Sequence, residues 1–443
     1  MLIARAGLLD GGVADIRLDG AIVEVGDRLA PQPGEQVYDA RGGTVLPGLH
    51  DHHMHLRSAA AALASVPVGP PRVCTPAQLR EALRAAHTDA DGWIRAVGYH
   101  DSVAGALDRQ RLDALSPAVP VRVQHRSGAL WILNSTALDR IGRPDHPDGL
   151  FFRTDPAIPH TRVISLRPLS ERLTAHGVTG ITDATPGHIR RDIETFTRAR
   201  QSGQLAQRLY CMAVAGTEAT SEVDVGPAKI ILDDTALDLD VLCRSVAENH
   251  AADHPVAVHA VTDSQLVVTI AALREVGVHP GDRIEHAAVV PDDCIADLVE
   301  LGVTVVTQPN FVAERGSEYR MEVPVAQHDQ LWRVASLQTA GVPVALSTDS
   351  PFGDGDPWAT MRAAVHRSTP DGAVLGVAER ISPRTAIQSF IGRPDRPADA
   401  RRIAPGQPGD LCILSVPPRQ VLAELDADLV AATVIGGVLI GGG

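Results

Sequence analysis

From residue 178 onward the sequence alternates short apolar runs, rich in β-branched residues, with longer stretches of helical periodicity. This alternation is typical of repeated βα units, whose strands lie parallel in one sheet. The stretches between the runs are long enough for the right-handed crossovers that parallel strands require. Strands are expected at 178–185, 228–234, 255–261, 283–288, 303–310 and 343–350, and helices at 236–252, 263–276, 291–301, 327–340 and 357–367.

Two runs farther upstream bring the number of expected strands to eight. They are TVLPGLHDHHMHL at 44–56 and VPVRVQHR at 119–126. Eight parallel strands with intervening helices favour an α/β fold of the closed (β/α)8 TIM-barrel type. An open, doubly wound sheet is the alternative that the same pattern allows.

The two ends of the chain lack this alternation of apolar runs and helical stretches. Residues 1–45 and 405–443 contain short runs joined by Gly and Asp turns, which predict β-strands. We expect both ends to meet in one small β-sandwich, with the barrel spanning 46–404. Extra helices and a hairpin-like DGLFFRTDP (148–156) indicate an insertion around 56–170, over the barrel mouth.

Charge and composition exclude several classes of function. The formal net charge of −14 argues against a nucleic-acid or anionic-membrane surface, because both favour basic patches. No apolar run approaches the ~20 residues that span a bilayer, and the first residues lack a signal-peptide pattern. The five cysteines are scattered, with no CxxC pair, and indicate reduced thiols. We expect a cytoplasmic protein with a small-molecule substrate, and a homodimer is an assembly that the sequence allows.

The strongest local motif is PGLHDHHMH at 47–55. In an extended strand, residues two apart point to the same side, so His53 and His55 can bind one ion together. The apolar run before them places the pair near the carboxyl end of the strand, which is the catalytic face of a (β/α)8 barrel. A surface histidine cluster is the alternative reading.

Three more candidate ligands fall at the carboxyl ends of expected strands. His259 ends PVAVHAV, His286 ends RIEHA, and Asp349 lies in ALSTDS. One such histidine is most often a hydrogen-bonded core residue, but three candidates at equivalent positions favour a metal site. For Asp349 the alternative role is a helix N-cap.

Lys229 is the only lysine among the 40 Lys and Arg residues of the chain. Arginine would serve wherever only a positive charge is needed, so a retained lysine indicates chemistry that requires a primary amine. An unprotonated lysine can capture CO₂ and become a carbamate, an anionic ligand able to bridge two divalent ions. The guanidinium of arginine cannot do this, because it keeps its charge.

These segments give the chain a resemblance to the amidohydrolase superfamily, and within it to the amidohydrolase-3 branch that includes the N-substituted formamide deformylases. The resemblance covers essentially the whole chain. It implies that His53 and His55 bind one metal, that His259 and His286 bind the other, that carboxylated Lys229 bridges them, and that Asp349 completes the site. The chain departs from the branch near the expected pocket, where relatives carry Gly-His-Ala and this chain has Gly128-Ala129-Leu130. The substrate of a relative should therefore not be transferred.

The expected activity is hydrolysis of an amide-type C–N bond, in an N-formyl, N-acyl or cyclic amide. Two divalent ions, with zinc favoured by imidazole and carboxylate ligands, would activate water at neutral pH. Asp349 is the expected general base, which then protonates the departing nitrogen. Residues near expected strand ends that could contact the substrate are His125, Trp131, Tyr99 and Asn310.

Two other functions are consistent with the same fold. A one-metal deaminase of an aminated ring typically has an HxxE acid after the strand histidine, but His286 is followed by Ala-Ala-Val. A non-catalytic scaffold would be expected to lack ligands, yet all six candidates are present. The sequence thus favours the metal-dependent amidohydrolase.

Overall fold

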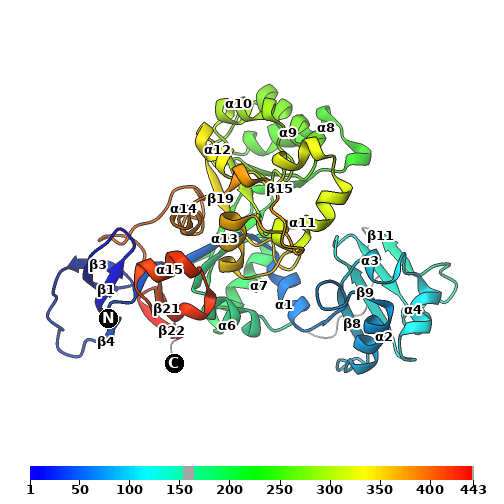
Figure 1. Ribbon diagram of the computed structural model, residues 1–443, viewed down its shortest axis with the longest axis horizontal. Coiled ribbons are helices and arrows are strands. Elements are labelled where there is room, and N and C mark those ends of the chain that lie inside the picture. Colours follow the sequence, from blue (N-terminus) through cyan, green and yellow to red (C-terminus); the bar gives the residue numbers. More distant parts are fainter. Residues whose placement is uncertain (153–163, 442–443) are drawn as a thin grey trace. The chain divides into compact units, whose positions relative to one another are not determined.

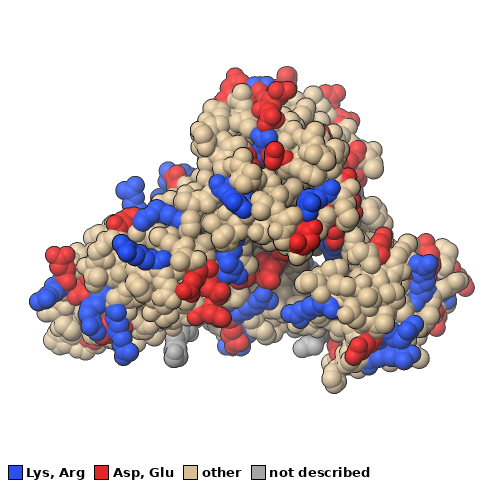
Figure 2. All heavy atoms as spheres, viewed as in Figure 1, with Lys and Arg blue, Asp and Glu red and all other residues tan. Residues whose placement is uncertain are grey.

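The computed structural model describes residues 1–152 and 164–441, in two compact units. The first unit comprises residues 1–56 and 169–443, and the second comprises residues 57–168. Both have mixed α/β structure (Figure 1). No helix in the described ranges is long and apolar enough to cross a membrane. Acidic and basic side chains are interspersed over the face drawn in Figure 2.

Strands from both ends of the chain join in one sheet of the first unit. Along this sheet the order is β22-β21-β20-β5-β1-β2-β3, and β4 pairs with β1. The link between the two ends is the antiparallel pair of β20 and β5, in which Leu411 lies opposite Pro47. The sandwich packing of these strands stays a prediction. The strands are β1 (Leu2–Leu8), β2 (Val13–Asp19), β3 (Ala21–Gly26), β4 (Val37–Asp39), β5 (Thr44–Pro47), β20 (Leu411–Leu414), β21 (Val430–Ile435) and β22 (Val438–Gly441).

Two parallel sheets form the centre of the first unit, with orders β14-β13-β12-β6 and β15-β16-β17-β18-β19. Only Pro227 separates β14 from β15, and a proline cannot donate to the ladder, so one strand is divided there. The parallel sheets are consistent with a (β/α)8 barrel. Their strands are β6 (Leu49–Met54), β12 (Val178–His188), β13 (Arg208–Ala213), β14 (Val223–Gly226), β15 (Ala228–Ile231), β16 (Val256–Ala260), β17 (Arg283–His286), β18 (Thr304–Thr307) and β19 (Val344–Leu346).

Helices connect these strands, and some of them begin at capping side chains. The hydroxyl of Thr262 accepts from the Gln265 amide at the start of α9, and Asp238 caps α8 in the same way. The helix expected at 327–340 is instead η2 (Val325–Gln330) followed by α12 (Ala335–Ala340), because Trp332 between them has a left-handed φ of 50°. The other helices are α1 (Leu56–Leu63), α6 (Arg167–Ala175), α7 (Arg190–Gln201), α8 (Leu239–Ala251), α9 (Asp263–Val276), α10 (Asp292–Leu301), α11 (Asn310–Glu322), α13 (Pro357–His366), α14 (Pro383–Gln388) and α15 (Pro418–Glu424), with short 3₁₀ turns η1 (Asp234–Ala236), η3 (Val377–Glu379) and η4 (Ala427–Leu429).

The second unit has its own sheet, in the order β11-β10-β9-β8-β7, and its own apolar core. The expectation that 119–126 is a barrel strand is therefore wrong, because β9 pairs with β8 and β10 of this unit. Local alternation predicts a strand but not the sheet that the strand joins. β13 lies between β12 and β14 in the barrel-like sheet and was not expected. The elements are β7 (Val66–Pro67), β8 (Ile94–Tyr99), β9 (Val121–His125), β10 (Leu130–Leu133), β11 (Leu150–Phe152), α2 (Pro76–Ala85), α3 (Asp101–Ala104), α4 (Arg109–Leu115) and α5 (Ser135–Arg140).

The hairpin-like segment expected at 148–156 is described only in part. β11 pairs antiparallel with β10, with Trp131 opposite Phe151. Residues 153–156 lie outside the described residues.

Candidate metal centre

His53 lies in β6, where every residue is buried, and the half-buried His55 follows directly after that strand. The segment after β19 runs alongside it: the amide of Asp349 donates to the carbonyl of His53 (2.9 Å), and the amide of His55 donates to the carbonyl of Ser350 (2.8 Å). The buried carboxylate of Asp51 also accepts from the amide of Thr348 (3.1 Å). These bonds hold the Asp349 loop against the histidine strand.

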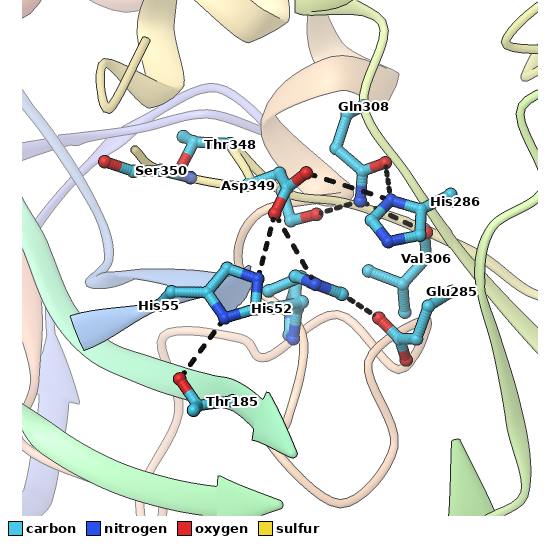
Figure 3. A network of polar contacts seen from close by, with 12 residues as sticks. His52, His55, Thr185, Glu285, His286, Val306, Gln308, Thr348, Asp349 and Ser350 are labelled. Atoms are coloured by element: carbon cyan, nitrogen blue, oxygen red, sulfur yellow. Dashed lines mark hydrogen bonds and ion pairs between the residues drawn. The ribbon is translucent and has the colours of Figure 1, made fainter. Parts of the chain in front are cut away.

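Three candidate ligands converge on one point. Oδ1 of Asp349 is 3.6 Å from Nε2 of His53. The same oxygen is 3.4 Å from Nε2 of His55, a contact marked by a dashed line in Figure 3. One ligand atom from each residue lies within 4.8 Å of the others. Asp349 has a left-handed φ of 54°, a strained conformation for a non-glycine residue that is often found at functional sites.

His286 and His259 lie beside this group. The ring centroid of His286 is 4.7 Å from that of His53 and 4.5 Å from that of His259. Nδ1 of His286 is 4.0 Å from Oδ2 of Asp349. On β17 it is Glu285 that pairs in register with His259 and so shares its side of the sheet, and His286 would point the other way by alternation. The left-handed φ of His286 (73°) and of Ala287 (44°) accompanies the turn of the imidazole toward the group.

Lys229 lies on β15, in register with Ala257, two residues before His259 on the neighbouring strand. Its Nζ is buried and has no hydrogen-bond partner within 1–152 and 164–441. Burial lowers the pKa of Lys229 to about 8, although Glu285 and Asp349 nearby oppose the shift. An amine in this state gives up its proton far more readily than an ordinary surface lysine.

His53 and His259 favour the neutral form that binds metals. Burial, followed by the nearby charge of Lys229, lowers the pKa of His53 to about 4 and that of His259 to about 3. Burial alone would raise the pKa of Asp349, but the close contacts with His55 and the other nearby histidines outweigh it and hold the pKa well below its usual range. Neutral imidazoles around an ionised carboxylate are a donor set suited to a divalent ion.

Several ligand atoms have no protein partner in the described ranges. Nε2 of His53, Oδ1 of Asp349 and Nζ of Lys229 are all buried and make no hydrogen bond there. Buried polar atoms are normally paired, so a cluster of exceptions indicates an ion or water at this point. The residues present therefore fit a metal centre.

The residues that hold the candidate ligands in place were not predicted from the sequence. Nδ1 of His53 donates to Glu285, whose other oxygen accepts from Nε of Arg283. Nδ1 of His286 donates to Oε1 of Gln308 (2.8 Å), and Nδ1 of His55 lies 3.2 Å from Oγ1 of Thr185. The only sequence signal for Glu285 was a carboxylate inside the expected strand RIEH. In the structure every residue of this strand is buried.

The suggested substrate contacts are divided between the two units. Tyr99, His125 and Trp131 belong to the second unit: Tyr99 is buried and donates to the carbonyl of Gly105, and Trp131 packs under the guanidinium of Arg122 at 3.9 Å. Asn310 belongs to the first unit, is buried, and its amide donates to the carbonyl of Thr348 (3.1 Å). Asn310 thus braces the loop that carries Asp349.

Residues 36–440 match the family model described as amidohydrolase family. The chain is 24% identical to an N-substituted formamide deformylase from Arthrobacter pascens, over 98% of this chain and 94% of the relative. Among solved structures, an uncharacterized metal-dependent hydrolase from Pyrococcus horikoshii OT3 is similar with a TM-score of 0.75 at 18% identity, over 95% of this chain and 98% of that chain. N-isopropylammelide isopropylaminohydrolase from Burkholderia multivorans is similar with a TM-score of 0.56 at 15% identity, over 99% and 97%.

Proposed function

The chain belongs to the amidohydrolase family, as a hydrolase acting on C–N bonds, and from this premise we propose that it cleaves an N-formyl, N-acyl or cyclic amide at the metal centre. The observation that carries the proposal is the convergence of His53 and His55 on Asp349, at 3.6 and 3.4 Å. Two imidazoles and an ionised carboxylate form the kind of ligand set that divalent ions prefer. They come from segments that lie far apart in the chain.

The proposed scaffold is a closed (β/α)8 barrel. The backbone bonds between β6 and the segment after β19 support closure at one seam, and the divided strand β14–β15 supports continuity at the other. In such a barrel the carboxyl ends of the strands form the catalytic face. Five of the six candidate ligands lie at or just after those ends, and Lys229 lies within β15.

Two divalent ions, with zinc favoured, would be held by His53, His55, His259, His286, Asp349 and a carbamate of Lys229. When bound, they would polarise a carbonyl and lower the pKa of a water. The carbamate forms when the lone pair of Nζ attacks the carbon of CO₂ and Nζ loses one proton to solvent. The buried, unpaired Nζ and its lowered pKa support this assignment.

Asp349 is the proposed general base and acid. Its carboxylate is ionised at neutral pH and can take a proton from the attacking water. It then delivers that proton to the amide nitrogen as the C–N bond breaks, because an amine leaves far more easily than its anion. The bonds from Asn310 and Asp51 hold this loop in place during both transfers.

The test combines elemental analysis of protein purified without chelator with a screen of N-formyl, N-acyl and cyclic amides. We expect close to two divalent ions per chain and turnover of at least one of these amide types. A ratio of one that added zinc and bicarbonate do not raise, together with release of ammonia from an aminated ring, would favour the one-metal deaminase. Cleavage of phosphoesters without any amide turnover would contradict the proposal.

A further inference from the structure

Thr185, near the end of β12, makes a side-chain contact with the candidate ligand His55. Oγ1 of Thr185 lies 3.2 Å from Nδ1 of His55, while Nε2 of His55 faces Asp349 at 3.4 Å. We propose that Thr185 is a positioning residue that fixes the ring and tautomer of His55 for metal binding. This inference rests on the proposed function, because it requires His55 to be a ligand.

The chemistry of imidazole makes this contact consequential. A neutral imidazole carries one proton, so a ligand that binds through Nε2 must carry that proton on Nδ1. The Thr185 hydroxyl oxygen can accept this proton in a hydrogen bond, which leaves the Nε2 lone pair directed at the ion. Groups that hold the second ring nitrogen of a histidine ligand typically change metal affinity by about 10–100-fold when they are removed.

The structure holds Thr185 firmly. Its backbone amide donates to Oδ1 of Asp183 (3.0 Å), which closes an Asx turn. The other carboxylate oxygen of Asp183 is 3.3 Å from Nε2 of His188, and both side chains are buried. Gly187, with a φ of 76°, allows the chain to turn so that His188 returns to Asp183. The backbone of Thr185 is thus held by the buried carboxylate of Asp183, which also lies against His188.

The two ligands of the H-x-H pair are therefore held differently. His53 donates to the charged Glu285, whereas His55 has the neutral hydroxyl of Thr185. The same strand also offers an internal comparison: Oγ1 of Thr182 lies 2.9 Å from Nε2 of His50, which is buried and lies outside the group of convergent ligands. Thr182 and Thr185 make the same kind of contact to histidines of one strand, but only Thr185 touches a candidate ligand.

The experiment measures Zn²⁺ affinity by competition with a chromophoric chelator in wild type, Thr185→Val, Thr185→Ser and Thr182→Val. Valine matches threonine in shape but lacks the hydroxyl. We expect Thr185→Val to bind zinc about 10–100-fold more weakly. Thr185→Ser should bind within about threefold of wild type, and so should Thr182→Val, whose thermal unfolding temperature alone should fall. The visible spectrum of the Co²⁺-loaded Thr185→Val protein should also shift.

The outcomes separate this inference from the proposed function. Wild type that binds no zinc would defeat the proposed function itself. Wild type that binds zinc while folded Thr185→Val binds it equally well would overturn the positioning role. Should Thr185→Val not fold, Thr185→Ser decides: a folded serine variant with tenfold weaker zinc binding would show that the hydroxyl is not the group that matters.

Discussion

His53 and Glu285 come from β6 and β17, far apart in the sequence, and the imidazole Nδ1 donates directly to the buried carboxylate. Arg283 binds the other oxygen of Glu285, and its Nη2 donates to the carbonyl of His52 (2.6 Å). Arg283 thereby balances the negative charge of the Glu285 carboxylate. Nε2 of His53 is directed at Asp349. In known metal centres, a carboxylate paired with a histidine in this way raises the basicity of that histidine.

Glu285→Gln should weaken metal binding by about 10–100-fold, because a neutral amide supports the imidazole less well than a carboxylate. Chelator competition with Zn²⁺ measures the effect. Glu379→Gln is the matched control: Glu379 is also buried, but its carboxylate accepts from the amides of Val334 (2.9 Å) and Ser336 (3.1 Å). The control should lose stability and keep zinc affinity. Equal zinc affinity in both variants would show that Glu285 does not support the metal centre.

Lys229→Arg should abolish activity and strip metal, although it preserves charge and approximate length. A guanidinium cannot take up CO₂, and as a cation it repels the ions. Lys229→Ala should be equally inactive, but it leaves space in which acetate or propionate can replace the carbamate and restore some activity. Activity and metal content of both variants are the measurements. An active Lys229→Arg enzyme would leave a metal site of histidines and Asp349 without a bridging carbamate.

Asp349→Asn should lower kcat by about 10²–10⁴-fold while the fold is retained, which is the usual contribution of a general acid–base group. Asp356→Asn is the matched control, since it makes the same change seven residues later. Asp356 caps α13 by accepting from the Trp358 amide (2.8 Å), and asparagine caps a helix about as well. Steady-state kinetics should therefore show the loss of kcat in Asp349→Asn and not in Asp356→Asn. Wild-type turnover by Asp349→Asn would assign the base to another residue.

Activation of metal-free enzyme by zinc and CO₂ should accelerate as the pH rises from 7 to about 8.5 and then level off. The pKa of Lys229 lies near 8, so about a tenth of the amine is free at pH 7, far more than for an ordinary lysine. Raising the pH removes the proton that blocks attack of Nζ on CO₂, so the rate of activation increases with pH. The rate is followed at constant dissolved CO₂, so that only the amine titrates. A rate that continues to climb beyond pH 10 would mean that Lys229 is not perturbed.

The sequence alone was sufficient to predict the βα rhythm and the histidine pair. Their signals are local: the period of two in H-x-H puts His53 and His55 on one side of β6, and apolar runs mark β15 to β19 as strands. The single lysine stood out by composition. These features depend on residues close together in the chain, which is why they can be read without a structure.

Sheet membership was decided only by tertiary structure. The alternating run at 119–126 is a strand, but it pairs inside the second unit, while β12 pairs directly with β6 and the unexpected strand Arg208–Ala213 lies between β12 and β14. Alternation reports that one face of a strand is buried. It carries no information on which neighbour supplies the hydrogen bonds.

The hydrogen-bond partners of the candidate ligands could not be predicted from the sequence either. Glu285 meets His53 across 232 positions, and Thr185 meets His55 across 130. His286 occupies a position that alternation assigns to the outer side, and its left-handed backbone accompanies the turn inward. Candidate ligands can be chosen by residue type and local period, whereas the orientation of their side chains depends on long-range contacts and backbone strain that only the folded chain creates.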